Sequence, residues 1–575
     1  MINAIKELKK FNYDLNIVEQ YQKSDQTYLK DNTLYYKNIP EGLMLLVNKV
    51  NNNEIEINSS LANFGTMIDV SRGAVFNTNY IKDLIRKKAL MGVNELWIYM
   101  EDIYELDKYP SFGYQRGRYS KEELKEIIDY ANIFGINIVP AIQTLGHMEQ
   151  FLRWFGNRPM MDQNNCLLTR SNETFELIFE MLKFFKENFS ITKIHLGLDE
   201  TWGFGFGLFY KKNGYVEPMK LFLEHLNKVN DMALQLGYEE VLIWSDMFFR
   251  FLSETNNYYD PNIILTEEVI NNIPKNITLV YWDYYNKDKK LVSKMVENHI
   301  NTNRKVIFAS GTWIWTKFNY DKKQTDETAL MHLEVALENN LEDFILTQWL
   351  DDGAFGDHES TLLGVYELSV KAKTYNKINK EVFEYITKMN YDKQIIKSRI
   401  NQTTISQVGL LWDDPLYSVY LNNHTNNDVK LIEKNINELI ELKKIFENDS
   451  YYEFEYNIVM SNLYKLQARV KMLTNYFNKT KINIEEEYNN QIKHLKFLNN
   501  YFSNLWYTKY KPNGFEAIQS RIATQIYRAK EMIKFINLYN EGKIKQINAF
   551  DEKVGVYKQY VPEKHSYVAF TMKPF

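Results

Sequence analysis

The chain has 575 residues, which is too long for one compact core and predicts two or three domains. Its apolar fraction of 45% and charged fraction of 25% are ordinary for a globular protein and argue against a disordered chain. The formal net charge of −5 comes without a strongly basic block, so we expect no nucleic-acid partner.

The cysteine content and the hydropathy of the chain indicate the cellular compartment in which we expect the protein. Cys166 is the single cysteine, so no internal disulfide can form. No run approaches the roughly 18 apolar residues that span a bilayer. Residues 1–15 lack the uninterrupted apolar core of a signal peptide. We therefore expect a cytoplasmic protein that contacts no membrane.

The first 60 residues differ in pattern from the rest. Residues 43–47 and 54–57 are short strand candidates on either side of the turn-prone Asn51, Asn52 and Asn53. The pattern predicts a small N-terminal α/β segment over residues 1–60.

Between residues 61 and 370, short apolar runs alternate with amphipathic helical segments. One of these segments begins with the capping signal Ser120-x-x-Glu123. Eight such units predict an α/β protein with a (β/α)₈ barrel over residues 61–370. An open doubly wound sheet is the alternative, but it needs a glycine-rich turn after the first strand, and residues 71–74 match that poorly. The strand-like runs are residues 64–70, 95–100, 136–142, 193–198, 240–244, 278–281, 305–309 and 343–348.

Residues 371–575 show long helical periodicity with few breakers, which predicts an α-helical C-terminal domain. Long amphipathic helices often dimerise, so a homodimer is an open alternative to a monomer. Residues 412–415, Trp-Asp-Asp-Pro, interrupt the helical pattern. They form either an ordinary interhelical turn or a contact with the barrel rim or a partner.

Functional residues of barrel enzymes lie at the C-terminal ends of the strands. Every predicted strand here ends in a carboxylate, an arginine, a histidine or a tryptophan. Indole walls with charged groups between them suit sugars, whose C–H faces stack on aromatic rings while polar groups hold the hydroxyls. Any one tryptophan alone is equally explained by packing at the barrel rim. The residues concerned are Arg72, Glu101, Asp102, His147, Asp199, Glu200, Trp202, Trp244, Asp246, Trp282, Tyr284, Tyr285, Trp313, Trp315, Trp349, Asp351 and Asp352.

The fourth predicted strand ends in two adjacent carboxyl groups. Strand alternation places His195, Gly197 and Asp199 on the inward face, and Glu200 lies one step further out. Adjacent carboxylates repel and gain little from packing, so the pair is better explained by acid–base chemistry. His195 alone is typical of a buried structural histidine. The chain contains no His-x-His, so we expect no metal and no other cofactor.

Residues 195–200, His-x-Gly-x-Asp-Glu, resemble the signature of family 20 glycoside hydrolases, the β-N-acetylhexosaminidases. The resemblance covers about residues 60–370. The loop sequences are most similar to the bacterial intracellular-type branch with a helical C-terminal domain. Arg72 matches the arginine that holds the outer sugar hydroxyls, and Trp349 and Asp351 match the tryptophan and the acid of the last strand. His147 matches the histidine of the family's Gly-His.

The resemblance implies a retaining exo-β-N-acetylhexosaminidase that acts by substrate-assisted catalysis. Glu200 would protonate the leaving oxygen, the sugar's own 2-acetamido carbonyl would attack, and Asp199 would orient that amide. The implied substrate is an oligosaccharide or glycoconjugate that ends in β-linked N-acetylglucosamine or N-acetylgalactosamine. The implied candidates for the acetamido cage are Trp244, Trp282 and Trp313.

Two positions depart from the family pattern. Many members carry Tyr-x-Asp after the seventh strand, where this chain has tryptophans, so the tyrosine donor to the acetamido oxygen is either Tyr284 or Tyr285. Gln143 stands near the position at which many relatives have an acid paired to the histidine, so the orientation of His147 is open.

Two other functions fit parts of the pattern. A conventional two-carboxylate retaining β-glycosidase would take its nucleophile from another strand, from Asp246 or Asp351. A catalytically silent carbohydrate-binding barrel would keep the tryptophan walls, but it would not need both Asp199 and Glu200.

Overall fold

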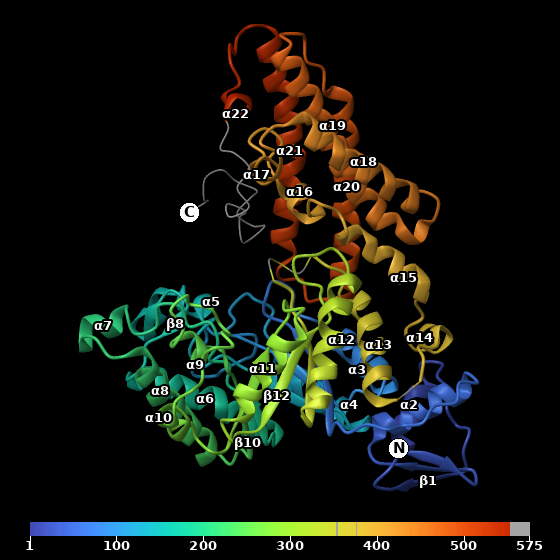
Figure 1. Ribbon diagram of the computed structural model, residues 1–575, viewed down its shortest axis with the longest axis vertical. Coiled ribbons are helices and arrows are strands. Elements are labelled where there is room, and N and C mark those ends of the chain that lie inside the picture. The colour runs from blue at the N-terminus through green and yellow to red at the C-terminus, as the bar shows by residue number, and fades with distance from the viewer. Residues whose placement is uncertain (352, 354, 375, 553–575) are drawn as a thin grey trace.

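A computed structural model describes residues 1–351, 353, 355–374 and 376–552 of the chain (Figure 1). Its centre is a closed barrel of eight parallel strands that follow one another around the ring in chain order. Each of the eight predicted apolar runs forms one of these strands, so the prediction of a (β/α)₈ barrel is confirmed. The strands are β4 (Asn63–Asp69), β5 (Glu95–Tyr99), β6 (Asn137–Ala141), β9 (Lys193–His195), β10 (Glu240–Trp244), β11 (Ile277–Trp282), β12 (Val306–Gly311) and β13 (Asp343–Gln348).

A helix follows each strand of the barrel. The predicted capping signal is formed at the start of α4: the Glu123 backbone N–H donates to Ser120 Oγ at 3.2 Å, and the Ser120 N–H donates to the Glu123 carboxylate at 2.9 Å. These two hydrogen bonds satisfy two of the backbone N–H donors that have no partner within the helix at its start. The helices are α3 (Thr78–Leu90), α4 (Lys121–Ile133), α6 (Asn172–Phe189), α8 (Pro218–Gln235), α10 (Glu267–Asn272), α11 (Lys289–Ile300), α12 (Lys322–Glu338) and α13 (Leu362–Lys373).

The interior of the barrel is a packed apolar core. Trp97, Leu242, Val280 and Ile345 are fully buried there, so the barrel is closed below its C-terminal end. The loops beyond the strands carry further short elements, most of them on the side of β6, β9 and β10. These are α5 (Glu149–Leu152), β7 (Met161–Gln163), β8 (Cys166–Leu167), α7 (Leu208–Asn213) and α9 (Asp246–Arg250).

The N-terminal segment is α/β, but its strands are not the predicted ones. Residues 43–47 lie inside a helix, and of residues 54–57 only Ile57 pairs, in an isolated bridge to Thr374. The helix is buried on nearly all sides, so its apolar run carries no helical period to distinguish it from a strand. Three other strands form a sheet in the order β1-β3-β2. The elements are α1 (Ile2–Lys9), β1 (Gln20–Lys23), β2 (Tyr28–Lys30), β3 (Thr33–Tyr36) and α2 (Ile39–Val50).

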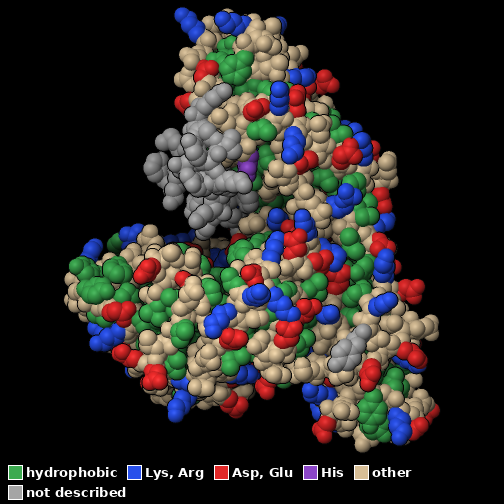
Figure 2. All heavy atoms as spheres, in the orientation of Figure 1, with side chains coloured by type: hydrophobic (Ala, Val, Ile, Leu, Met, Phe, Trp, Pro, Cys, Tyr) green, Lys and Arg blue, Asp and Glu red, His purple; other side chains and the backbone are tan. Residues whose placement is uncertain are grey.

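The described part of the region after α13, up to residue 552, is helical, as predicted, and its long helices rise from the barrel (Figure 1). In the described part of the chain no helix combines the length and the apolar content needed to cross a bilayer. Figure 2 shows acidic and basic side chains interspersed over one face of the molecule. The helices are α14 (Lys380–Thr387), α15 (Tyr391–Ser398), α16 (Gln407–Trp412), α17 (Val419–Thr425), α18 (Val429–Phe446), α19 (Glu453–Phe477), α20 (Glu485–Lys509), α21 (Phe515–Asn540) and α22 (Asn548–Asp551).

The interrupted segment at residues 412–415 contacts the barrel. Trp412 is fully buried, and its ring centre lies 6.4 Å from that of Phe318 and 6.2 Å from that of Phe355. These two phenylalanines belong to the loops after β12 and β13. Of the interpretations left open by the sequence, the structure therefore supports packing on the barrel rim.

Candidate active site

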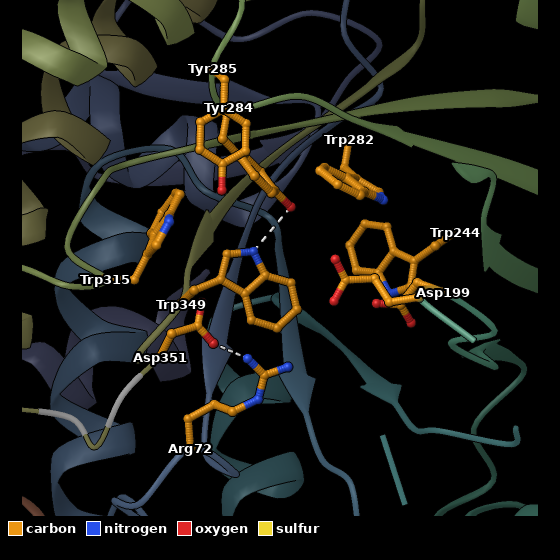
Figure 3. Close-up of a pocket in the computed structure, with 10 residues that line it drawn as sticks. Arg72, Asp199, Trp244, Trp282, Tyr284, Tyr285, Trp315, Trp349 and Asp351 are labelled. Atoms are coloured by element: carbon orange, nitrogen blue, oxygen red, sulfur yellow. Dashed lines mark hydrogen bonds and ion pairs between the residues drawn. The ribbon is translucent and has the colours of Figure 1, made fainter. Parts of the chain in front are cut away.

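A cavity opens at the C-terminal end of the barrel, and we call it the inner cavity (Figure 3). Nine of the eleven residues to which the family resemblance gave a role line it. The two others are His147, which lies beside it, and Trp313, whose place on the wall is taken by Trp315. The lining residues are Arg72, Asp199, Glu200, Trp244, Trp282, Tyr284, Tyr285, Trp315, Trp349 and Asp351.

The backbone that carries the carboxyl pair is unusual. Strand β9 ends at His195, earlier than predicted, and Gly197, Leu198 and Glu200 have φ angles of 75°, 75° and 48°. Position 197 favours glycine, because its φ lies in the left-handed region and a Cβ there would lie 2.8 Å from the Ile142 carbonyl oxygen. Left-handed backbone at Leu198 and Glu200 is strained, and such strain persists where surrounding contacts fix it. Simple strand alternation therefore does not describe this segment.

Asp246 supplies one of those contacts. Its carboxyl group accepts the Glu200 backbone N–H at 3.1 Å. Asp246 is fully buried, and burial, reinforced by the negative charge of Asp199, raises its pKa well above the usual value. Burial therefore disfavours the charged form of this carboxyl group, which holds the Glu200 backbone from below.

His195 is a structural histidine, as the sequence suggested. Its Nδ1 accepts the Gly197 backbone N–H at 3.0 Å. Its ring packs on Trp244 and Trp97, with centroid distances of 4.4 and 5.3 Å. Burial lowers the pKa of His195 to about 3, so the ring is neutral at pH 7.

Asp199 is paired with His147. The Nε2 atom of His147 lies 3.2 Å from one carboxylate oxygen of Asp199 and 3.6 Å from one of Glu200. Burial disfavours the charged form of each partner, but the attraction between the two charges is stronger. Asp199 therefore raises the pKa of His147 to about 9. His147 in turn holds the pKa of Asp199 below its usual value. At neutral pH the two form a buried imidazolium–carboxylate pair, which settles the orientation of His147.

A hydrogen-bond network links Asp199 to Arg72 across the floor of the site. The Gln143 side-chain N–H₂ donates to Asp199 Oδ1 at 2.9 Å and to the Tyr99 hydroxyl at 3.1 Å. Arg72 Nη2 donates to the same hydroxyl at 3.2 Å. Gln143 thus holds Asp199 and does not pair with His147. Sequence reasoning missed Tyr99, although its place at the end of β5 was the available signal.

Arg72 is fixed from four sides. Its Nε donates to Glu101 at 3.1 Å, and its Nη1 forms an ion pair with Asp351. Its guanidinium carbon lies 5.2 Å from the ring centres of both Tyr99 and Trp349. A guanidinium held in this way presents its remaining N–H groups in a fixed geometry.

The two candidate tyrosines occupy different depths. Tyr284 is buried, its hydroxyl oxygen accepts Trp349 Nε1–H at 3.0 Å, and its ring stacks on Trp282 at 5.4 Å. Burial raises the pKa of Tyr284, so its hydroxyl keeps its proton at neutral pH. Tyr285 is 60% exposed and lies at the mouth. Figure 3 shows the Tyr284 hydroxyl pointing toward Trp349, inside the ring of lining residues.

Trp313 lies behind the wall. Its ring stacks on Trp315 with centroids 4.0 Å apart, and its Nε1–H donates to the Trp315 carbonyl oxygen at 3.0 Å. Trp315 is the residue that faces the inner cavity. Trp313 therefore supports the wall and is not placed to contact a ligand in the cavity.

The described residues contain one group of three potential metal ligands, formed by His147, Asp199 and Glu200. Their ligand atoms lie within 4.8 Å of one another. The ion pair between His147 and Asp199 is enough to explain why these groups lie close together. A protonated histidine has no free lone pair with which to bind a metal ion. The absence of a metal cofactor stays a prediction.

Residues 64–365, more than half of the chain, match the family model described as the catalytic domain of glycosyl hydrolase family 20. The chain belongs to this family. Residues 381–569 match a second model, described as the glycoside hydrolase 20C C-terminal domain. The predicted family and the helical C-terminal domain are both confirmed.

Individual relatives are distant. Hexosaminidase D of Bos taurus is 25% identical over 289 residues, which cover 48% of this chain and 76% of that protein. Hexosaminidase D of Homo sapiens is 25% identical over 221 residues, or 37% of this chain and 43% of the human protein. Beta-hexosaminidase 3 of Arabidopsis thaliana is 28% identical over 210 residues, or 33% of this chain and 38% of the plant protein. This chain therefore spans less than half of the human and plant relatives.

Solved structures of the family are also remote in sequence. The exo-β-N-acetylglucosaminidase of Vibrio harveyi has 12% identity and a TM-score of 0.49, over 69% of this chain and 72% of that one. The chitobiase of Flavobacterium johnsoniae has 15% identity and a TM-score of 0.49, over 87% and 88%. These matches are too remote in sequence to carry over the role of any site residue.

Proposed function

We propose that the protein is a retaining exo-β-N-acetylhexosaminidase that releases terminal β-linked N-acetylglucosamine or N-acetylgalactosamine by substrate-assisted hydrolysis. Family membership supports glycoside hydrolysis, and the hexosaminidase names of the relatives support the substrate class. One observation carries the mechanism: an ionised Asp199 adjoins Glu200 in an aromatic-walled cavity. An acetamido group that becomes positively charged as it reacts needs such a carboxylate beside it.

Binding comes first in the proposed reaction. The terminal sugar lies over Trp349, and Arg72 and Asp351 hold its outer hydroxyls at one side of the inner cavity. Because Glu101 and Tyr99 fix Arg72, the sugar is oriented before any bond changes. This orientation brings the reacting atoms together and lowers the entropic part of the barrier.

Bond breaking then uses the sugar's own nucleophile. Glu200 donates its proton to the glycosidic oxygen as the bond from that oxygen to the anomeric carbon breaks. The acetamido oxygen attacks the anomeric carbon and forms an oxazolinium ring, whose N–H Asp199 stabilises. Glu200, now a carboxylate, takes a proton from water as the water oxygen attacks the anomeric carbon. The bond from that carbon to the acetamido oxygen breaks, and the oxazolinium ring opens. Two inversions at the anomeric carbon give net retention.

The acetamido group fits the part of the cavity between Asp199 and Tyr284. We assign the donor to the acetamido oxygen to Tyr284, because its protonated hydroxyl is buried inside the cavity whereas Tyr285 lies at the mouth. Trp244 and Trp282 enclose the methyl group. Trp315 takes the wall position that the sequence gave to Trp313.

The two alternatives are less well supported. A conventional nucleophile must reach the anomeric carbon, but Asp246 is fully buried beneath Glu200. Asp351 is ion-paired with Arg72. A catalytically silent sugar-binding barrel would not need the ionised Asp199, whose negative charge the His147 imidazolium stabilises.

Aryl glycosides test this function directly. We expect the 4-nitrophenyl β-N-acetylglucosaminide and galactosaminide to be hydrolysed with release of the β-anomer. The matching β-glucoside lacks the internal nucleophile, so its kcat/KM should be lower by on the order of 10³-fold or more. Comparable kcat/KM values for the glucoside and the N-acetylglucosaminide would contradict the proposal.

A further inference from the structure

A second, larger cavity adjoins the inner one, and we call it the outer cavity. Its volume is about 710 Å³, within the range of roughly 300–1,000 Å³ that is usual for ligand sites. Five residues line both cavities: Arg72, Glu200, Tyr285, Trp315 and Asp351. The two cavities therefore meet at these residues, and a group that projects from the inner cavity past them would enter the outer one.

The helical C-terminal domain forms part of the outer cavity. Gly514, Glu516 and Ala517, at the start of α21, line it together with residues of the barrel loops. In Figure 1 the N-terminal end of α21 lies next to the barrel. The site is thus completed by a domain that lies outside the family's catalytic-domain match at residues 64–365.

This wall is fixed relative to the catalytic residues. Lys511 N–H donates to the Val75 carbonyl at 2.7 Å, and Asn77 N–H donates to the Lys509 carbonyl at 3.0 Å. These bonds join the turn between α20 and α21 to the loop that carries Arg72. Gly514 has a φ of 97°, and a Cβ there would lie 1.7 Å from the Gly73 carbonyl oxygen. The two hydrogen bonds and this close backbone packing set the position of the start of α21 against the loop.

The lining of the outer cavity is polar and nearly balanced in charge. Among the described residues it holds four cationic side chains, with His147 protonated, and five carboxyl groups. The opposite charges therefore nearly cancel. Neutral donors and acceptors such as Gln115 and Thr316 lie between them. A neutral, hydroxyl-rich ligand matches this lining better than an anion or an apolar chain.

Glu200 sets the orientation of such a ligand. It is the proposed proton donor to the leaving oxygen, and it lies at the border of the two cavities. The group attached to that oxygen therefore enters the outer cavity. Tyr285, 60% exposed and on the same border, offers a ring face on which a sugar can stack.

We propose that the outer cavity binds the neutral sugar to which the terminal N-acetylhexosamine is linked, and that the start of α21 contacts this sugar. The inference rests on the proposed function, because it uses Glu200 as the acid. It makes the C-terminal domain a determinant of which glycosidic linkages the enzyme cleaves.

Filling the outer cavity tests this assignment. Ala517 is exposed on α21 and lines the cavity, so Ala517→Trp places an indole in it without disturbing a core. The matched control is Gln519→Trp, on an exposed residue of the same helix that is absent from the cavity lining. Both full-length variants are assayed with β1,2-, β1,3-, β1,4- and β1,6-linked N-acetylglucosaminyl disaccharides. The affinity for an N-acetylglucosamine thiazoline, which fills only the inner cavity, is measured by calorimetry.

For the disaccharide that the native enzyme cleaves fastest, we expect Ala517→Trp to raise KM by about tenfold or more through a steric clash. Gln519→Trp should leave KM within about twofold, and both variants should bind the thiazoline as the native enzyme does. Equal KM values for the two variants, or a parallel loss of thiazoline affinity in Ala517→Trp, would overturn the assignment. Failure of the native enzyme to bind the thiazoline would instead overturn the proposed function.

Discussion

Replacing Glu200 with glutamine is expected to lower kcat/KM for a disaccharide substrate by roughly 10²–10⁴-fold, the usual contribution of a general acid–base group. Glutamine keeps the size of the side chain, and the backbone bond from residue 200 to Asp246 does not involve the side chain. The substitution therefore removes proton transfer while the inner cavity keeps its shape. Steady-state kinetics on purified Glu200→Gln measures the effect.

The dependence on the leaving group separates a lost acid from a damaged site. A 2,4-dinitrophenyl leaving group needs little protonation, so the formation of the oxazolinium should be nearly as fast in Glu200→Gln as in the native enzyme. A pre-steady-state release of dinitrophenolate would show this. Full activity of Glu200→Gln on a disaccharide would mean that another residue is the acid.

Replacing Asp199 with asparagine should lower kcat by roughly 10²–10³-fold, as the loss of one preorganised electrostatic contact to a developing charge typically does. The asparagine amide cannot compensate the positive charge of the oxazolinium. Binding of the uncharged ground state should suffer less, so the loss should appear in kcat more than in KM.

Titration of His147 provides an independent check of the Asp199→Asn variant. In the native protein Asp199 raises the pKa of His147 to about 9 against the effect of burial. Without the carboxylate, burial dominates, and the pKa should fall so that the imidazole is neutral at pH 7. Nitrogen NMR of histidine-labelled protein, assigned with His147→Gln, measures this change. An unchanged pKa would show that the pair does not control the charge of His147.

Much of the site could be predicted because parallel strands gather their C-terminal ends at one rim. Arg72, Glu200 and Asp351 are far apart in sequence, but each stands just after an apolar run. Counting strands was therefore enough to bring them together. The exception, Trp313, reflects the backbone after β12: the strand extends to Gly311, beyond the predicted end, and Trp315 rather than Trp313 faces the cavity.

Other features follow from contacts that no local pattern encodes. The left-handed backbone at Glu200 is held by Asp246, which follows the next strand of the barrel. The contact between Gly73 and Gly514 joins residues of different domains. The continuous apolar run at residues 43–47 predicts a strand, but it lies in a helix that is buried on nearly all sides, so the run itself has no helical period. The domain boundaries after residues 60 and 370, a homodimer and a cytoplasmic location stay predictions.

The central claim is that the attacking group belongs to the sugar, and progressive fluorination of that group tests it most directly. Fluorine withdraws electrons from the acetamido carbonyl and weakens its oxygen as a nucleophile, with little change in size. For the 4-nitrophenyl N-acetylglucosaminides with none, one, two and three fluorines on the acetyl methyl, we predict a stepwise fall in kcat/KM. Values that do not change along the series would contradict participation of the acetamido group and favour a nucleophile supplied by the protein.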